Sequence, residues 1–185
     1  MTTTGRDTAA HLEKVEAPGS MLTKTAAKAL AVLRISTGFV FLWAFFDKTF
    51  GWGYATPSAK AWINGGSPTK GFLSSVDVGP TWLQDFFHNI AGTGWVNWLF
   101  MLGLLGIGLA LTFGIAMRLG TIAGFALYLM MWSVALWPAN NPVLDDHILG
   151  ALSMVVLGVT LAGDTWGLGT AWSRIKMVRR FSILR

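Results

Sequence analysis

Four apolar stretches constrain the fold of this chain more strongly than any other feature. Trp95 to Met117 and Leu119 to Trp137 carry no charged side chain over 23 and 19 residues, and residues 29 to 46 carry one. The run from Ile148 to Gly163 has 16 residues and reaches the length of a span if its helix begins six residues earlier. Because a bilayer core takes about 20 apolar helical residues, the sequence predicts transmembrane helices at about 27–48, 95–117, 119–138 and 142–164.

Composition supports the membrane class. Charged residues make up 12% of the chain, about half the share that is usual in soluble domains. The chain has no cysteine, which removes disulfides, thiolate metal sites and dithiol relays from its own chemistry. We therefore expect an all-α integral membrane protein.

The distribution of Lys and Arg predicts which helix ends face the cytoplasm. Ten of the 14 lie in the N-terminal tail, at the joint of the second and third helices or in the C-terminal tail, against three (Lys48, Lys60 and Lys70) on the opposite side. The positive-inside rule then places both termini in the cytoplasm, in a multi-pass protein of the plasma (inner) membrane. Residues 1–25 are predicted as a disordered cytoplasmic tail and 169–185 as a basic cytoplasmic tail.

Short connections and small residues predict how the helices pack. The joints favour a four-helix bundle of up-down-up-down topology. Small residues at four-residue spacing, such as Gly120 and Gly124, allow close approach within one chain or between copies, so a homo-oligomer stays open. The net charge of +5 is interpreted as topology and attraction to membrane lipid, without nucleic-acid binding.

The outer connection, residues 49–94, is long enough to carry structure of its own. "TWLQDFFHNI" (81–90) has apolar residues along one helical face, which predicts an amphipathic helix lying in the membrane interface. Thr81 and Gln84 fit a capping box at its start. The Gly-rich segment from Trp62 to Leu73 is predicted as a lid over the outer mouth of the bundle, with an ordinary surface loop as the alternative.

The ten tryptophans allow two interpretations. Most fall near predicted helix ends, where the aromatic belts of membrane proteins lie. In the second interpretation, outer tryptophans such as Trp43 and Trp137 form the walls of a pocket for a flat ring.

Three motifs resemble a known family. "LRISTGFVFLWAFFDKTFG" (33–51), "GGSPTKGFL" (65–73) and "DDHILGALSMVVLG" (145–158) look like DoxX-like four-helix membrane proteins. The chain looks closer to the DoxD type, the membrane subunit of thiosulfate:quinone oxidoreductase. The resemblance covers about residues 28–168 and implies a four-helix membrane domain at 26–168. The matching positions are Arg34, Gly38, Lys48, Gly65, Gly66, Pro68, Gly71 and His147.

This resemblance implies a quinone cofactor and a partner oxidoreductase subunit. Many members of the family carry a His-Gly or similar pair shortly before the Lys, whereas Phe45, Phe46 and Asp47 stand here. A proton-handling role at that point therefore requires Asp47 to substitute.

Arg34 lies inside the first predicted span, where a charge is costly. Three interpretations stay open. Its side chain snorkels to the cytoplasmic surface, pairs with Asp164 at the same end of the fourth helix, or anchors a lipid or quinone headgroup.

Two aspartates and a histidine open the last apolar stretch. Asn141 as a cap, Pro142 as the first helical residue and acids in the first turns explain Asp145 and Asp146 by helix physics alone. His147 gains nothing from the helix dipole there, and a His beside an acid supplies a quinone with a hydrogen-bond donor and a proton. The predicted catalytic residues are His147, Asp146, Asp145 and Lys48.

Two functions from different classes follow. The first is a DoxX/DoxD-type membrane subunit that binds quinone at the outer side and takes part in quinone-linked oxidation of a thiosulfate-like sulfur compound. The alternative is a non-catalytic membrane scaffold or lipid-handling module for a partner enzyme. No haem, flavin or metal site is expected, since no paired histidines, nucleotide motif or ligand spacing is visible. The predicted cofactor-binding residues are Arg34, Asp47, Trp43, Trp137, Gly65, Gly66 and His88.

Overall fold

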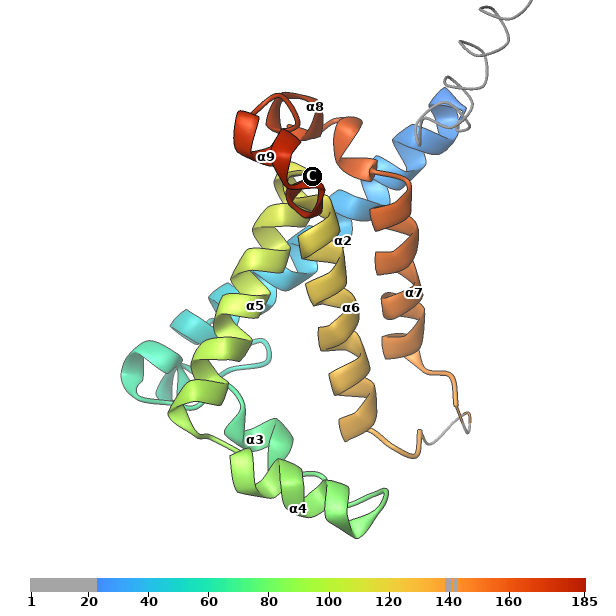
Figure 1. Cartoon of the computed structure of the whole chain (residues 1–185). Coiled ribbons are helices and arrows are strands. Elements are labelled where there is room, and N and C mark those ends of the chain that lie inside the picture. Colours follow the sequence, from blue (N-terminus) through green and yellow to red (C-terminus); the bar gives the residue numbers. More distant parts are fainter. Residues whose placement is uncertain (1–22, 139–140, 142) are drawn as a thin grey trace, which may run out of the picture.

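The computed structural model describes residues 23–138, 141 and 143–185. Throughout these residues the regular structure is helical and includes no strand, which confirms the all-α prediction. Most of the predicted N-terminal tail, and Pro142 as a predicted helix start, lie outside the described residues. The four longest helices are α2 (Lys24–Phe50), α5 (Gly94–Phe113), α6 (Met117–Val134) and α7 (Asp146–Val159) (Figure 1).

Three of these helices are long and apolar enough to cross a membrane. They are α2, α5 and α6, with 27, 20 and 18 residues. The apolar α7 has 14 residues, which at 1.5 Å per residue reach about 21 Å of the roughly 30 Å of a bilayer core.

Local sequence sets the ends of the first two spans. Thr23 caps the start of α2, where its side-chain oxygen accepts a hydrogen bond from the Ala26 N–H at 3.1 Å. Gly51 ends α2 and Gly114 ends α5, each with a left-handed backbone (φ of 68° and 70°) that glycine adopts without strain. The prediction that the second span continues to residue 117 is therefore wrong, because Gly114 ends it at Phe113.

The start of α7 also differs from the prediction. Asp145 is the N-cap, and its carboxylate accepts the backbone N–H bonds of His147 and Ile148 at 3.0 and 3.1 Å. Asn141, the predicted cap, accepts two backbone N–H bonds within the preceding turn instead. The helix therefore begins at Asp146, four residues later than predicted, because Asp145 satisfies the first free donors.

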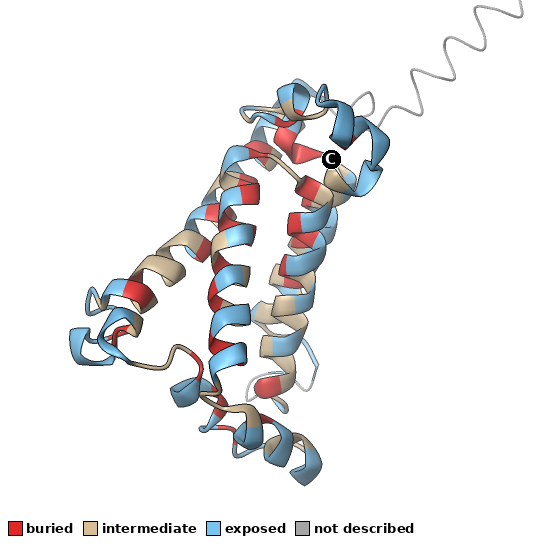
Figure 2. Cartoon of the chain, turned by 60° about the vertical axis from the view of Figure 1, so that its left-hand side comes forward, coloured by how far each residue is buried: buried red, intermediate tan, exposed pale blue. Residues whose placement is uncertain are grey.

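The helices pack in chain order, α2 on α5, α5 on α6 and α6 on α7. Figure 2 shows that buried residues form stripes on the inward faces of the helices while much of their remaining surface is exposed. Close packing at Gly120 and Gly124 is confirmed within the chain, since an added Cβ would lie 2.7 Å from Ala110 and 2.8 Å from Met154. The buried core comprises Phe41, Met101, Leu104, Ile107, Leu111, Met117, Met154, Leu157 and Ala162.

The two ends of the helical domain are built differently. At one end, which we call the capped end, lie η3 (Ala162–Asp164), α8 (Gly169–Trp172), α9 (Lys176–Arg180) and η4 (Ser182–Leu184) (Figure 1). At the other, the loop end, lie η1 (Ser58–Lys60), η2 (Trp62–Asn64), α3 (Lys70–Leu73) and α4 (Thr81–Ile90). The predicted basic tail is thus folded, and the backbone N–H of Arg118 donates a hydrogen bond to the Arg185 carbonyl at 2.8 Å.

The predicted amphipathic helix at 81–90 is confirmed as α4. Its apolar face buries Phe87 against the loop segment while Trp82 stays 70% exposed. The capping box is not formed: Pro80 is the cap residue, and the Gln84 amide donates to the Gly79 carbonyl at 2.9 Å.

Candidate functional site

Arg34 is fully buried in α2 and donates hydrogen bonds to five backbone carbonyls. Its Nη1 binds the carbonyls of Leu111 and Thr112 near the end of α5, the second at 3.0 Å. Its Nε binds the Ala162 carbonyl at 3.1 Å. The remaining nitrogen, Nη2, binds the carbonyls of Thr165 and Trp166 at 3.2 and 3.0 Å. The side chain thereby joins α2 to the ends of α5 and of the segment that follows α7.

These contacts overturn the three interpretations of Arg34. A guanidinium has five N–H donors, and five carbonyls accept them, so none is left for a headgroup or for solvent. The ion pair predicted with Asp164 is absent from the described contacts, because that carboxylate pairs with Arg185 at 3.3 Å. The positive charge is offset by carbonyl dipoles, which point their negative ends out of helix C-termini.

Glycines bring the backbone close enough to surround the guanidinium. A Cβ on Gly114 would lie 3.0 Å from Arg34 Nη1, and one on Gly167 would lie 3.1 Å from Nη2. A Cβ on Gly163 would lie 2.4 Å from the Gly114 carbonyl oxygen. The close packing around Arg34 therefore depends on glycines, which have no side chain, at the end of α5 and in the segment after α7.

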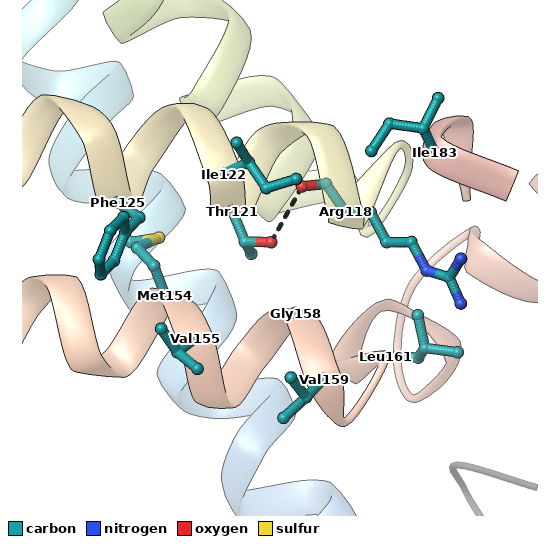
Figure 3. Close-up of a pocket in the computed structure, with 10 residues that line it drawn as sticks. All are labelled: Arg118, Thr121, Ile122, Phe125, Met154, Val155, Gly158, Val159, Leu161 and Ile183. Atoms are coloured by element: carbon teal, nitrogen blue, oxygen red, sulfur yellow. Dashed lines mark hydrogen bonds between the residues drawn. The ribbon is translucent and has the colours of Figure 1, made fainter.

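A hollow of about 550 Å³ opens between α6 and α7 toward the capped end. We call it the groove. Figure 3 shows Phe125 and Met154 at one end, Arg118 and Ile183 at the other, and Gly158 between them on α7. Thr121 is buried, and its hydroxyl donates to the Met117 carbonyl at 2.7 Å, so the wall it forms is apolar. The full lining is Arg118, Thr121, Ile122, Phe125, Met154, Val155, Gly158, Val159, Leu161 and Ile183.

A second hollow, of about 470 Å³, adjoins the groove at the capped end. We call it the arginine pocket. Arg118 lines both hollows, so the two meet at that side chain. The full lining is Arg118, Ser173, Arg174, Val178, Arg179, Ser182 and Arg185.

At the loop end, His147 and Asp145 form a hydrogen-bonded pair. His147 Nδ1 lies 2.7 Å from Asp145 Oδ2, and both side chains are partly exposed. Partial burial acts to raise the pKa of the Asp145 carboxyl, but the hydrogen bond from the His147 ring, the two capping N–H bonds and the His147 charge outweigh it. The net effect holds the pKa of Asp145 below its ordinary value.

The other predicted polar residues of this end are held elsewhere. Asp47 is 1% exposed, and its carboxylate accepts the backbone N–H bonds of Tyr54 and Ala55 at 3.3 and 3.0 Å. It therefore fastens the chain that follows α2. The Lys48 ammonium lies 6.0 Å from the ring centroid of Phe100, on α5.

The predicted cofactor-binding residues do not come together around one space. Trp43 packs on Trp52 and Tyr54, with ring centroids 5.3 and 5.0 Å apart, and Trp137 is 65% exposed.

The other predicted residues each have separate surroundings. His88 Nε2 is hydrogen-bonded to the Val76 carbonyl at 2.8 Å. Gly65 has open space around it, whereas Gly66 packs against the Lys60 carbonyl. Asp146 is exposed in the first turn of α7.

The Gly-rich segment predicted as a lid is fastened to the start of α5. The Asn97 side-chain oxygen accepts hydrogen bonds from the Ser67 hydroxyl at 2.9 Å and from the Thr69 hydroxyl at 2.6 Å. Trp62 packs edge-on against Trp98, with ring centroids 4.7 Å apart. Sequence reasoning missed this clasp, although Asn97 is the one amide in the apolar run from Trp95 to Met117.

Sequence reasoning also missed the groove and the arginine pocket. The signal available for them was the cluster of arginines after residue 173, which was interpreted as topology and attraction to membrane lipid, with no pocket expected. Among the described residues, no group of three or more His, Cys, Asp or Glu side chains could hold a metal ion. No protein-family model, curated protein or solved structure matches the chain.

Proposed function

We propose that this chain is a multi-pass membrane protein that binds the apolar tail of a lipid in the groove between α6 and α7. This is the lipid-handling alternative that the sequence left open. The observation that carries it is the groove itself, a hollow of about 550 Å³ whose wall is mostly apolar, with Arg118 at one end.

In this proposal α2, α5 and α6 cross the bilayer, and α7 with the turn after it forms a fourth, shorter membrane segment. Large apolar side chains on the outer faces of the helices support it, among them Leu99 at 65% and Leu149 at 59% exposed. Such surface is normal against lipid and costly against water. The proposal puts the capped end and both termini in the cytoplasm, which the basic residues of that end support by the positive-inside rule.

The hollow explains why a lipid tail would prefer the groove to the flat helix faces. Gly158 lets α7 pack closely on α6, since an added Cβ would lie 2.5 Å from the Thr121 hydroxyl oxygen, and Val155 forms part of the lining beside this contact. A tail lying in the hollow is surrounded on several sides, and close contacts of this kind add up over many atoms. An occupied groove would also avoid the loss of packing that a void causes.

Photolabelling in lipid nanodiscs tests this function. The full chain is reconstituted with a phosphatidylcholine that carries a diazirine near the end of one acyl chain, and labelled residues are mapped by mass spectrometry. We expect enrichment at Ile122 and Phe125 over Leu102, which is exposed on α5 outside the groove.

Two matched variants on α7 sharpen the experiment. Val155→Trp fills the groove, whereas Val156→Trp places the same ring on a neighbouring exposed position outside it. The first should lower labelling of Phe125 and the second should leave it unchanged. Uniform labelling around α5, α6 and α7, or equal effects of the two variants, would show that only bulk lipid contacts these helices.

The His147–Asp145 pair favours a second candidate, quinone-linked oxidation of a thiosulfate-like sulfur compound in a DoxX/DoxD-type subunit. A quinone, when bound, supplies the two-electron redox chemistry. His147 would donate a hydrogen bond or a proton to it, and Asp145 would orient the ring and stabilise its protonated form. Asp146 and Lys48 lack such a partner in the described contacts, so this candidate rests on the pair alone.

Co-purification tests the second candidate independently of the first. Quinone extracted from the purified full chain is quantified beside that from His147→Gln, and quinone reduction is followed with thiosulfate as the electron donor. The candidate predicts bound quinone and a reduction rate that His147→Gln abolishes. Equal quinone content and equal rates in both proteins would contradict it.

A further inference from the structure

We propose that the arginine pocket binds the phosphate headgroup of an anionic phospholipid whose tail lies in the groove. This inference rests on the proposed function, and it adds the headgroup class that the site selects. The carrying observation is that a pocket lined by four arginines meets an apolar groove at one side chain, Arg118.

The chemistry of the arginine pocket suits a phosphodiester. Arginine presents its donors in a planar fork that binds two phosphate oxygens at once, and the pocket adds the hydroxyl of Ser182, whereas the Ser173 hydroxyl donates to the Thr170 carbonyl at 2.9 Å. Arg118 on α6 and Arg185 in the C-terminal segment both line the pocket. They are held together because the backbone N–H of Arg118 donates to the Arg185 carbonyl at 2.8 Å. The folded C-terminal segment therefore builds the pocket.

Within the part of the chain that the structure describes, side-chain carboxylates do not balance the charges around the pocket. Asp164 is the one acidic residue in the sequence after His147, and it pairs with Arg185 at 3.3 Å across a partly exposed contact. The Arg118 guanidinium donates to the Ser182 carbonyl at 3.2 Å. Among the described side chains, one carboxylate is thus paired at a pocket with four guanidinium groups, and the Arg185 Nε is buried there without an acceptor.

The groove decides between a lipid phosphate and a soluble one. Arg118 lies at the start of α6, a membrane-spanning helix in the proposed function, and Ile183 joins it at the same end of the groove (Figure 3). Headgroups lie at that depth in a bilayer, and basic pockets between helices on the cytoplasmic side bind anionic lipid headgroups. A free phosphate would use the arginines but leave the apolar hollow without a role.

The test is a binding titration on the full chain. The protein is delipidated in detergent, and bound lipid is counted by native mass spectrometry at rising concentrations of phosphatidylglycerol or of phosphatidylcholine with identical acyl chains. We expect phosphatidylglycerol to bind more tightly. In Arg174→Gln/Arg179→Gln its affinity should fall roughly thirtyfold, because each basic residue near an anionic headgroup contributes about fivefold.

A matched double variant controls for net charge. Lys176→Gln/Arg180→Gln removes two charges from the same short helix region, but neither residue lines the pocket. It should bind phosphatidylglycerol as the unchanged chain does, and far-UV circular dichroism should show equal helix content in all three proteins. Equal losses in the two double variants would overturn the proposal.

Two further arms separate this inference from the function on which it rests. Groove photolabelling by phosphatidylcholine should persist in Arg174→Gln/Arg179→Gln, and inorganic phosphate should compete poorly with phosphatidylglycerol. Equal affinity for the two lipids with intact photolabelling would overturn the headgroup assignment alone. Complete displacement by inorganic phosphate at comparable concentration would assign the arginines to a soluble anion and overturn it as well.

Discussion

The capped end and the loop end both place charged side chains beside apolar helices, and they treat those charges in different ways. At the capped end Arg34 is buried, and five carbonyls occupy all of its donors. At the loop end His147 and Asp145 bind each other while staying partly exposed. The first arrangement is complete without a ligand, whereas the second leaves polar atoms accessible.

This difference separates structural charge from binding charge. The buried cation, Arg34, is a structural link among α2, α5 and the turn after α7, although its place in an apolar helix suggested a functional site. Arg174, Arg179 and Arg185 of the C-terminal segment, whose charge suggested topology and attraction to membrane lipid, line a pocket. A charged side chain is therefore free to bind a ligand when its hydrogen-bond donors lack acceptors in the protein. Its position inside or outside an apolar helix does not decide this.

The largest effect should come from removing the capped-end link. Arg34→Met leaves five carbonyls without their hydrogen-bond donor. Because each buried polar group without a partner costs about 1–3 kcal/mol, the free energy of unfolding should fall by about 3 kcal/mol or more. Titration with sodium dodecyl sulfate in mixed micelles, followed by far-UV circular dichroism, measures it. Arg180→Met, at an exposed position, should change it by less than about 0.5 kcal/mol.

Arg34→Lys sharpens the same comparison. An ammonium keeps the charge but has three donors for five carbonyls, so its stability should lie between those of the unchanged chain and Arg34→Met. If Lys restored full stability, charge alone would matter and the carbonyl cage would be an incorrect explanation.

A smaller and local effect is expected at the loop end. Asn97→Ala leaves the Thr69 and Ser67 hydroxyls without their acceptor, at a cost of about 1–3 kcal/mol. Hydrogen exchange should accelerate in residues 67–73 and stay unchanged in α6 and α7, since this segment opens by itself. Asn89→Ala, exposed on α4, serves as the control. Faster exchange in α6 would show that the clasp supports the whole fold.

Loss of the α7 cap should have a still smaller effect. Asp145→Ala removes the acceptor of the His147 and Ile148 N–H groups, and such a cap contributes about 1 kcal/mol. Exchange of those two amides reports it. Asp146→Ala should cost less, because an exposed first-turn acid acts through the helix dipole alone, about 0.3–1 kcal/mol. Equal costs would remove Asp145 from its role as cap.

The pH dependence of that cap has a definite sign. Because the folded pKa of Asp145 is lowered from its ordinary 3.8, the ionised carboxylate stabilises the fold above that value. The contribution should be lost as pH falls below 3.8 through the folded pKa. Asp145→Asn should abolish this component of the acid unfolding curve while the unchanged chain retains it. A stabilising effect of acid on the start of α7 would contradict the assignment.

The sequence predicted the elements whose signals are local. Long apolar runs located α2, α5 and α6, and the spacing of apolar residues located α4. Helix ends were less predictable, because hydropathy continues past Gly114 while the left-handed backbone of that glycine ends α5. The cap of α7 was unpredictable for a similar reason. Asp and Asn both suit a cap position, and the geometry of the preceding turn makes Asp145 the cap in place of Asn141.

The candidate sites were less predictable because they depend on contacts between distant segments. The partners of Arg34 are backbone carbonyls 77 to 132 residues away, and carbonyls leave no mark in a sequence. The arginine pocket requires the C-terminal segment to fold back on Arg118, which composition does not indicate. The His147–Asp145 contact joins residues two apart, so it depends on local spacing, and the sequence placed His147 beside an acid without predicting this bond.

The central claim, that the capped end holds the ligand, can be tested by one crystallographic measurement. The full chain is crystallised with a phosphatidylglycerol that carries bromine on its acyl chain, and anomalous scattering locates the bromine. The expected result is a peak in the groove between Phe125 and Val155, with the headgroup density at Arg118. A groove without bromine, or a peak beside His147 at the loop end, would contradict it.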